Sequence, residues 1–283
     1  MFSKFLIAFC VVHLVRSTLI RQIAEYDYCK NKCKGNVDNT PCARHLHCQP
    51  VSGCFEIEMD KDKREEILNI HNHLRDMLAG GKDDKWKDIK ASNMIALSYD
   101  LQLEYLARCW VNTCQGGHDP CRITQNHPSI GQNSHWTSAN EINITRAVEG
   151  FYNEKENMND AQFDHFSGKG ENDGVIGHFT QVVWAKTVLV GCAAAKGKKG
   201  SYLICNYAPA GNWKDEPLFT RGDPCSACPD GKSCNDKYES LCGPIMAVPY
   251  EKWSDISSAR RLFKMSNYLA VWFVYFICLY VFQ

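Results

Sequence analysis

Residues 188–208 read VLVGCAAAKGKKGSYLICNYA, and this stretch predicts the β-hairpin at the centre of the fold. Two strand-like runs, Val188–Lys196 and Ser201–Ala208, flank the turn tetrapeptide GKKG. With a symmetric four-residue loop, paired positions sum to 397, so Cys192 lies opposite Cys205. Opposed residues on neighbouring strands have Cβ atoms about 4.5–5.5 Å apart. That separation allows a disulfide after slight adjustment, so we expect the bridge Cys192–Cys205.

Upstream of the hairpin, three segments have the apolar spacing of amphipathic helices. The first begins at a capping box formed by Asp62 and Glu65 and ends at the glycine pair 80–81. The second extends over Asp100–Cys114, and the third over about residues 140–155. Helices combined with an antiparallel hairpin predict an α+β fold.

Cysteine-rich segments lie on both sides of the helices and the hairpin. Residues 26–54 hold five cysteines with little apolar periodicity, which indicates a disulfide-stapled loop region. Residues 225–242 hold four more, and only the first two have the Cys-x-x-Cys spacing of a zinc site. In a secreted chain two disulfides explain these four cysteines better, with a connectivity that spacing alone leaves open. Residues 82–97 form a polar connection, and residues 156–177 form a long loop.

The composition favours an extracellular protein. The chain has 283 residues and 16 cysteines, a density typical of oxidising compartments. Without Cys10 and Cys278, which lie in the terminal segments, fourteen cysteines remain, consistent with seven disulfides. The 32 basic and 32 acidic residues give no net charge, so nucleic acid is not expected as a partner. The sequon at Asn143 is compatible with glycosylation.

Both ends of the chain have the pattern of targeting signals. Residues 1–17 combine a basic residue, a short apolar run and a final small residue, which predicts a secretory signal peptide. At the other end, the uncharged run Tyr268–Phe282 follows a polar spacer and three small residues that begin at Ser257. This pattern predicts a glycosylphosphatidylinositol anchor attached near Ser257, and a short membrane span is the alternative. Either would hold the protein at the outer face of the plasma membrane.

Four short motifs occur in an order that resembles one known family. They are His71-Asn72-His73-Leu74-Arg75, Gly131-Gln132-Asn133, residues 177–184 (GHFTQVVW) and residues 202–213 (YLICNYAPAGNW). Together they resemble the superfamily of cysteine-rich secretory proteins, antigen 5 and pathogenesis-related 1, abbreviated CAP, over about residues 60–213. The cysteine-rich start and segment 114–122 are similar to the antigen 5, or venom allergen-like, branch of arthropods. The resemblance implies an α-β-α sandwich.

The resemblance and the composition together divide the chain into six segments. We expect a signal peptide (1–17), a cysteine-rich N-terminal extension (18–59), a CAP domain (60–213), a small cysteine-rich C-terminal extension (214–242), a linker (243–257) and the anchor signal or short transmembrane tail (258–283).

Members of this family place two histidines and two acidic residues in a central cleft. By motif position the histidines are His118 and His178, and one acid is Glu154. The other acidic position is Gln132 in this chain, an amide. Two imidazoles and a carboxylate can bind a divalent metal such as zinc, but the missing charge weakens the attraction. We therefore expect no required cofactor and at most weak zinc binding at His118, His178 and Glu154.

The family pattern also implies most of the disulfides. It pairs Cys29 with Cys42, Cys33 with Cys121 and Cys192 with Cys205. It pairs Cys114 with either Cys48 or Cys54, and Cys109, which is additional to the pattern, takes the one that remains.

The sequence predicts a binding protein rather than an enzyme. It contains no Gly-x-Ser-x-Gly elbow and no His-Glu-x-x-His helix, and nothing in it brings Ser134 within reach of His178. The resemblance implies capture of a small apolar ligand, a sterol or a fatty acid. The apolar faces of the first and third helices are the candidates for the groove wall. Immune or signalling modulation through an extracellular protein is the alternative, and a hydrolase the third. His71 and His73, on the first helix, are expected to pack or cap rather than bind a metal.

Overall fold

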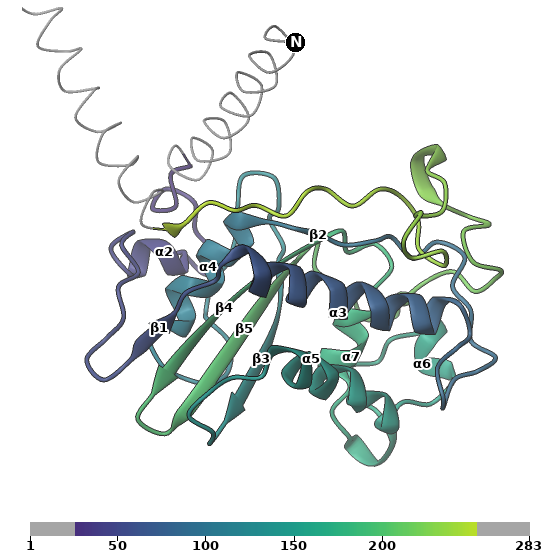
Figure 1. Cartoon of the computed structure of the whole chain (residues 1–283), viewed down its shortest axis with the longest axis horizontal. Coiled ribbons are helices and arrows are strands. Elements are labelled where there is room, and N and C mark those ends of the chain that lie inside the picture. The colour runs from purple at the N-terminus through teal and green to yellow at the C-terminus, as the bar shows by residue number, and fades with distance from the viewer. Residues whose placement is uncertain (1–25, 254–283) are drawn as a thin grey trace, which may run out of the picture. The chain divides into compact units, whose positions relative to one another are not determined.

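The computed structural model describes residues 26–253, which Figure 1 draws in colour. The chain divides into two compact units. One unit, residues 28–250, contains all the helices and strands named below, and of the other only residues 26–27 and 251–253 are described. The predicted signal peptide, Ser257 and the apolar tail lie outside the described residues. No helix within residues 26–253 combines the length and the apolar character that crossing a bilayer requires.

A five-stranded sheet lies at the centre of residues 28–250. Its main path is β1-β4-β5-β3, with every neighbouring pair antiparallel, and the two-residue strand β2 (Ser98–Tyr99) pairs in parallel with β4. The strands of the path are β1 (Phe55–Ile57), β4 (Leu189–Gly197), β5 (Gly200–Ala208) and β3 (Gly131–Thr137). The strand β3 therefore forms one edge of the sheet, as Figure 1 shows.

The central hairpin has the predicted register but a tighter turn. Cys192 lies opposite Cys205, and the two are joined in a disulfide. The strands extend as far as the pair Gly197 and Gly200, so the connecting loop has two residues instead of the predicted four. Gly200 has a φ of +135°, and a Cβ at this position would lie 1.9 Å from the carbonyl oxygen of Thr137. Glycine is therefore required where the hairpin turn passes the end of β3.

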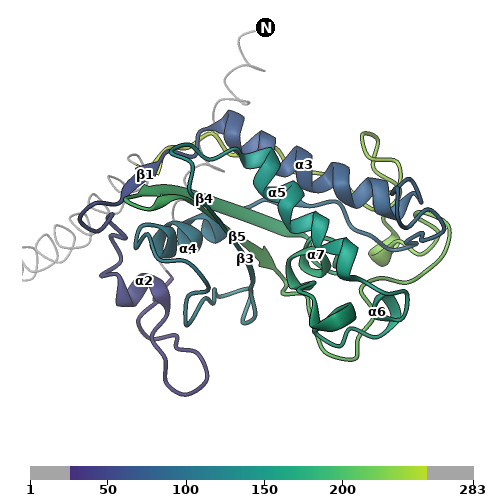
Figure 2. The same ribbon diagram turned by 90° about the horizontal axis from the view of Figure 1, so that it is seen from below.

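Helices cover both faces of the sheet, as Figure 2 shows. The helices α3 (Lys61–Ala79), α5 (Ile144–Tyr152) and α7 (Gly177–Val182) pack in one core with the sheet residues Cys192, Ala194, Leu203 and Cys205. The helix α4 (Leu101–Val111) packs against the alternate residues Ala193, Ala195, Tyr202 and Ile204 on the other face. The chain is thus the α-β-α sandwich that the resemblance implied.

Each of the three predicted helices has a boundary that was wrong. The second, predicted over Asp100–Cys114, ends at Val111. Asp60, rather than Asp62, caps α3, because its carboxylate accepts a hydrogen bond from the Lys63 amide at 2.9 Å. The predicted third helix is shorter than residues 140–155 and begins after Asn143, whose side-chain oxygen accepts from the Arg146 amide at 2.8 Å. A 3-10 turn, η1 (Asn153–Asn157), then carries the chain away from α5.

The connections contain more ordered and buried structure than their polar composition indicated. Residues 156–177 include α6 (Ala161–Asp164) and the 3-10 turn η2 (Glu171–Asp173), and their Phe163, Phe166 and Ile176 belong to the main core. In residues 82–97, Met94 and Leu97 are fully buried. The cysteine-rich N-terminal and C-terminal extensions contain one further short element each, α2 (Thr40–Ala43) and η3 (Pro229–Gly231).

All fourteen cysteines among residues 26–253 are paired. Three of the bonds, Cys29–Cys42, Cys33–Cys121 and Cys192–Cys205, are those that the family pattern implied. The pairing that the sequence left open is Cys54–Cys114, with Cys109 bound to Cys48. The C-terminal extension forms Cys225–Cys234 and Cys228–Cys242.

Candidate functional site

The four residues predicted for the central cleft come together at the edge strand β3. The rings of His118 and His178 have their centroids 6.5 Å apart. His118 contacts Gln132, with 3.0 Å between its Nδ1 and the amide oxygen, and His178 contacts Glu154, with 2.7 Å between its Nδ1 and a carboxylate oxygen. Each histidine therefore has one ring nitrogen held by its predicted neighbour.

A closed network fixes the Gln132 side chain. Its Oε1 accepts hydrogen bonds from the Asp119 amide and the Arg122 guanidinium, both at 3.2 Å, while its Nε2 donates to Asp119 Oδ1 and Asn206 Oδ1, both at 3.0 Å. Since Oε1 can only accept, the His118 Nδ1 carries the proton in a neutral ring. The Nε2 atom of His118 then keeps its lone pair.

Glu154 has a structural task besides its contact with the histidine. One carboxylate oxygen accepts from the backbone amides of His178 at 2.8 Å and Phe179 at 3.3 Å. These are amides of the first turn of α7, which have no partner inside the helix. Glu154 therefore holds both the start of α7 and the ring of His178. Because one of its oxygens binds the helix and the other the ring, it supports His178 rather than offering a free ligand.

The two histidines approach β3 from opposite faces of the sheet. Side chains alternate along a strand, so Gln132 points to the α4 side and Asn133 to the side of α3 and α5. Gln132 holds His118, whereas the Asn133 amide donates to the backbone carbonyl of His178 at 3.1 Å. The cleft is thus built across the free edge of the sheet.

A third histidine near the cleft was not predicted. His135 is half-buried on β3, and its ring lies 6.2 Å from that of Phe151, which in turn lies 5.0 Å from the His178 ring. Burial first, and then the nearby charge of His178, lower the pKa of His135. The available sequence signal was its alternation with Asn133, which puts both on one face of the strand.

The two histidines of α3, His71 and His73, do not belong to the pair of histidines in the cleft. His71 is fully buried, with 2.7 Å from Nδ1 to the Ile67 carbonyl and 2.8 Å from Nε2 to the Tyr207 hydroxyl. His73 is exposed. The packing role expected of His71 agrees with these contacts.

The donor set suits a metal only in part. Both cleft histidines present their Nδ1 to an oxygen acceptor, which is the usual support of an imidazole that binds metal through Nε2. However, within residues 26–253 the nitrogen and oxygen atoms of His118, His178 and Glu154 do not all come within 4.8 Å of one another. Two imidazoles alone leave half of a tetrahedral zinc shell to water. A metal here would be held by His118 and His178, and it would supply a Lewis acid.

The sulfur atoms of Cys225, Cys228 and Cys242 also lie within 4.8 Å of one another. Each of them belongs to a disulfide, so none is the thiolate that a zinc site requires. Their proximity follows from the two disulfides packed together in the C-terminal extension.

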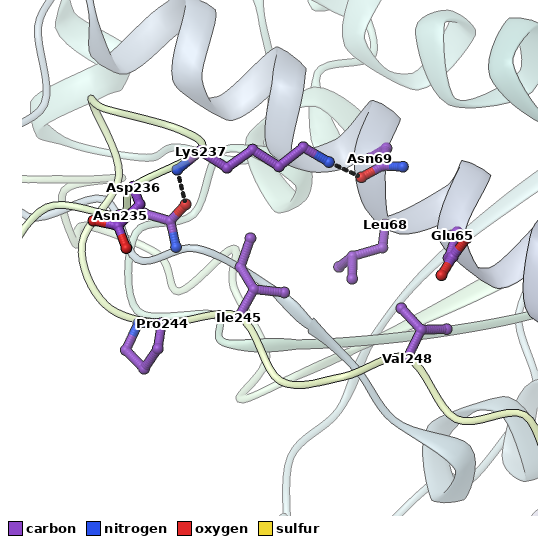
Figure 3. Close-up of a pocket in the computed structure, with 9 residues that line it drawn as sticks. All are labelled: Glu65, Leu68, Asn69, Asn235, Asp236, Lys237, Pro244, Ile245 and Val248. Carbon is purple, nitrogen blue, oxygen red and sulfur yellow. Dashed lines mark hydrogen bonds between the residues drawn. The ribbon is translucent and has the colours of Figure 1, made fainter.

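A pocket of about 520 Å³ lies apart from the cleft, between α3 and residues 235–248. Figure 3 shows Ile245 and Val248 projecting toward Leu68 of α3, and Lys237 reaching Asn69. The nine lining residues are Glu65, Leu68, Asn69, Asn235, Asp236, Lys237, Pro244, Ile245 and Val248. No sequence signal had pointed to this place, since its two walls are more than 160 residues apart in the chain.

The groove predicted between the first and third helices does not match the packing of α3 and α5. Ile67 and Leu74 of α3 belong to the same buried core as Ala147, Val148 and Phe151 of α5. A lipid placed between these faces would have to separate two packed helices. Amphipathic spacing identified the buried faces correctly, but it did not distinguish a packed face from an open one.

We expect that Gln132→Glu will weaken the cleft instead of restoring a metal site. The new carboxylate would place an oxygen where the amide nitrogen now donates to Asp119 and Asn206, so two favourable contacts become repulsive. A loss of about 2 kcal/mol in the free energy of unfolding is expected, measured with urea. Gln125→Glu, at an exposed glutamine of the loop that follows Cys121, is the control. A variant of unchanged stability that binds zinc more tightly by calorimetry would contradict this account.

Comparisons with known proteins agree with the geometry. A model described as the cysteine-rich secretory protein family (CAP) matches residues 68–207. A CRISP/Allergen/PR-1 protein of Trittame loki is 37% identical over 217 residues, which cover 70% of this chain and 53% of that protein. Venom allergen 5.02 of Dolichovespula maculata is 32% identical over 209 residues, which cover 69% of this chain and 94% of the relative. The chain thus spans about half of the first relative and nearly all of the second.

A solved structure has the same fold. The crystal structure of NaASP2 with Zn2+ is 26% identical and covers 69% of this chain and 100% of its own, with a TM-score of 0.56. The zinc belongs to that structure.

Proposed function

Since the chain belongs to the cysteine-rich secretory protein (CAP) family, we propose that it is an extracellular, non-catalytic binding protein of the venom allergen-like kind. Seven disulfides among residues 26–253 support an extracellular location. We propose further that its C-terminal tail attaches it to the outer membrane surface, as an anchor or as a span. Phospholipase release of intact protein from cells distinguishes these two forms of attachment.

The contacts of the cleft support a non-catalytic role. Nucleophilic catalysis requires a hydroxyl, thiol or amine within hydrogen-bond reach of an activating base. Among the described residues, the side-chain partners of His118 and His178 are Gln132 and Glu154, and no hydroxyl is bonded to either ring. Ser134 lies on the α4 side of β3, whereas Glu154 and His178 pack with α5 and α7. The described cysteines are all in disulfides.

We propose further that the protein captures a lipid, and the observation that carries this proposal is the pocket at α3. Its volume of about 520 Å³ is in the range of small-molecule sites. Leu68, Ile245 and Val248 offer an apolar wall on which an acyl chain gains about 0.8 kcal/mol for each buried methylene.

One cation at this pocket favours a fatty acid over a sterol. The Lys237 ammonium donates to Asn69 Oδ1 at 2.7 Å and lies 5.1 Å from the Tyr238 ring centroid, with no carboxylate partner among the described residues. Glu65, in contrast, is paired with Lys61 at 3.0 Å. The carboxylate of a fatty acid would complete the partners of Lys237, while Asp236 would repel it from the neighbouring position.

We expect Val248→Asp to weaken binding of a fluorescent fatty acid, cis-parinaric acid, about tenfold, because a charge replaces part of the apolar wall. Delipidated protein is titrated with the probe, and Val51→Asp, at a partly exposed valine elsewhere, is the matched control. Lys237→Met should weaken the binding of cis-parinaric acid more than the binding of cholesterol. If the affinity were the same in Val248→Asp and the original protein, the pocket would not be the lipid site.

A further inference from the structure

We propose that the free edge of β3 binds an extended peptide segment of an extracellular partner protein by strand addition. This proposal rests on the chain being a binding protein, but it concerns a surface separate from the lipid pocket. The strand pairs with β5 along its whole length, from Gly131 opposite Tyr207 to Thr137 opposite Ser201. Its other side has no strand partner among residues 26–253.

The hairpin disulfide shows which backbone groups of β3 face outward. The Cα atoms of Cys192 and Cys205 are 4.1 Å apart, the spacing of a pair that exchanges no backbone hydrogen bonds. Consistently, the Cys192 amide is bonded to the Tyr99 hydroxyl at 3.2 Å. The backbone groups of Cys205 therefore point to β3 and meet those of Asn133. Because hydrogen-bonding direction alternates along a strand, the N–H and C=O groups that face away from β5 are those of Gln132, Ser134 and Trp136.

Nothing in the described part of the chain uses these outward groups. No backbone or side-chain hydrogen bond reaches the main-chain N–H or C=O of Gln132, Ser134 or Trp136. They recur every second residue, about 7 Å apart, as alternating donors and acceptors along one line. The backbone of another extended chain has the same repeat. This complementarity identifies the partner as a peptide strand rather than a small molecule.

The edge also lacks the features that protect exposed strands. Natural edge strands are short, charged, bulged or interrupted by proline. The sequence GQNSHWT has no charged residue and no proline, and its seven pairs with β5 are in unbroken register. The opposite edge strand, β1, has three residues and includes Glu56. On β3, the side chain of Trp136 is 52% exposed, which supplies an aromatic anchor for an apolar residue of the partner.

The cleft histidines favour a single strand over a second copy of this chain. His118 and His178 flank the first half of β3 from opposite faces of the sheet, with their ring centroids 6.5 Å apart. A peptide can run from this pair of rings toward Trp136. A second copy pairing through its own β3 would bring its own histidine-bearing segments against those of the first. The cleft and the strand edge are thus parts of one continuous peptide site.

The test uses peptides selected from a phage-displayed library of random heptapeptides on the secreted, glycosylated protein. Ser134→Pro removes an outward N–H and places a ring at the edge without removing a hydrogen bond to β5, and it is expected to weaken binding about tenfold or more. Ser134→Ala, which keeps the backbone, is the matched control. The affinity of both variants for cis-parinaric acid should not change, which separates failure at this edge from failure of lipid capture.

A second measurement does not depend on the folding of the proline variant. Selected peptides are synthesised with N-methyl groups at alternate backbone positions. Strand addition predicts that methylation at one set of alternate residues weakens binding about tenfold and methylation at the other set has little effect. Equal effects of both sets, failure to select any peptide, or a dimer in solution that Ser134→Pro dissociates would each overturn the proposal.

Discussion

Replacing Arg75 by methionine is expected to lower the free energy of unfolding by about 4 kcal/mol. The guanidinium is fully buried in α3 and has no carboxylate among its hydrogen-bond partners. It is instead surrounded by backbone carbonyl oxygens, those of Ile95 (2.5 Å), Val182 (2.8 Å), Trp184 (2.9 Å), Thr187 (3.3 Å) and Ala185 (3.5 Å). Methionine fills a similar volume but donates nothing, so these buried acceptors would lose a shared donor.

This cost is large because one side chain of α3 satisfies carbonyl groups of two other segments, Ile95 and residues 182–187. Val182 ends α7, the helix that carries His178, and Ile95 precedes β2. Urea unfolding measures the effect, and Arg146→Met on the exposed face of α5 should cost less than about 0.5 kcal/mol. Arg75→Lys should fall between the two, since an ammonium cannot reach all of the oxygens. A loss below about 1 kcal/mol in Arg75→Met would show that water replaces the guanidinium.

The parts of the fold that could be predicted are those set by local pattern. The hairpin register followed from strand alternation around a glycine-flanked turn, and it placed Cys192 opposite Cys205 correctly. The start of α3 was misplaced by two residues because Asp60 and Asp62 both precede the apolar repeat, and only the geometry decides which one caps. The pattern likewise marked the apolar faces of α3 and α5 without showing that they pack together.

The site could be assembled only in outline, because its chemistry depends on neighbours from distant segments. The family motif identified His118, Gln132, Glu154 and His178. It could not show that the Gln132 amide donates hydrogen bonds to Asp119 and Asn206. These contacts require an amide at this position, so Gln132 is more than the loss of a carboxylate ligand. The outward-facing backbone of β3 is also a property of the whole sheet, since it depends on which neighbour each strand has.

Lowering the pH is expected to cause a second large loss of folding stability, because of His71 in α3. Burial lowers the pKa of this imidazole from 6.5 to about 4. Its Nδ1 lies 2.7 Å from the Ile67 carbonyl, which can only accept, so the neutral ring carries its proton there and receives the Tyr207 hydroxyl at Nε2. A second proton would put an unpaired charge in the core. The folded protein therefore keeps His71 neutral at a pH where the unfolded chain binds a proton.

The sign and the range follow from these two pKa values. Above pH 6.5 the ring is neutral in both states and has no effect on the pH dependence of folding. As the pH falls from 6.5 to about 4, only the unfolded state gains the proton, so this residue alone removes about 3 kcal/mol of stability. Below pH 4 its contribution is constant. Urea unfolding between pH 7 and pH 4 should show this slope, and His71→Gln should reduce it. His73→Gln, at the exposed histidine two residues away, should leave it unchanged. Equal slopes in the original protein and His71→Gln would mean that other groups cause the loss of stability in acid.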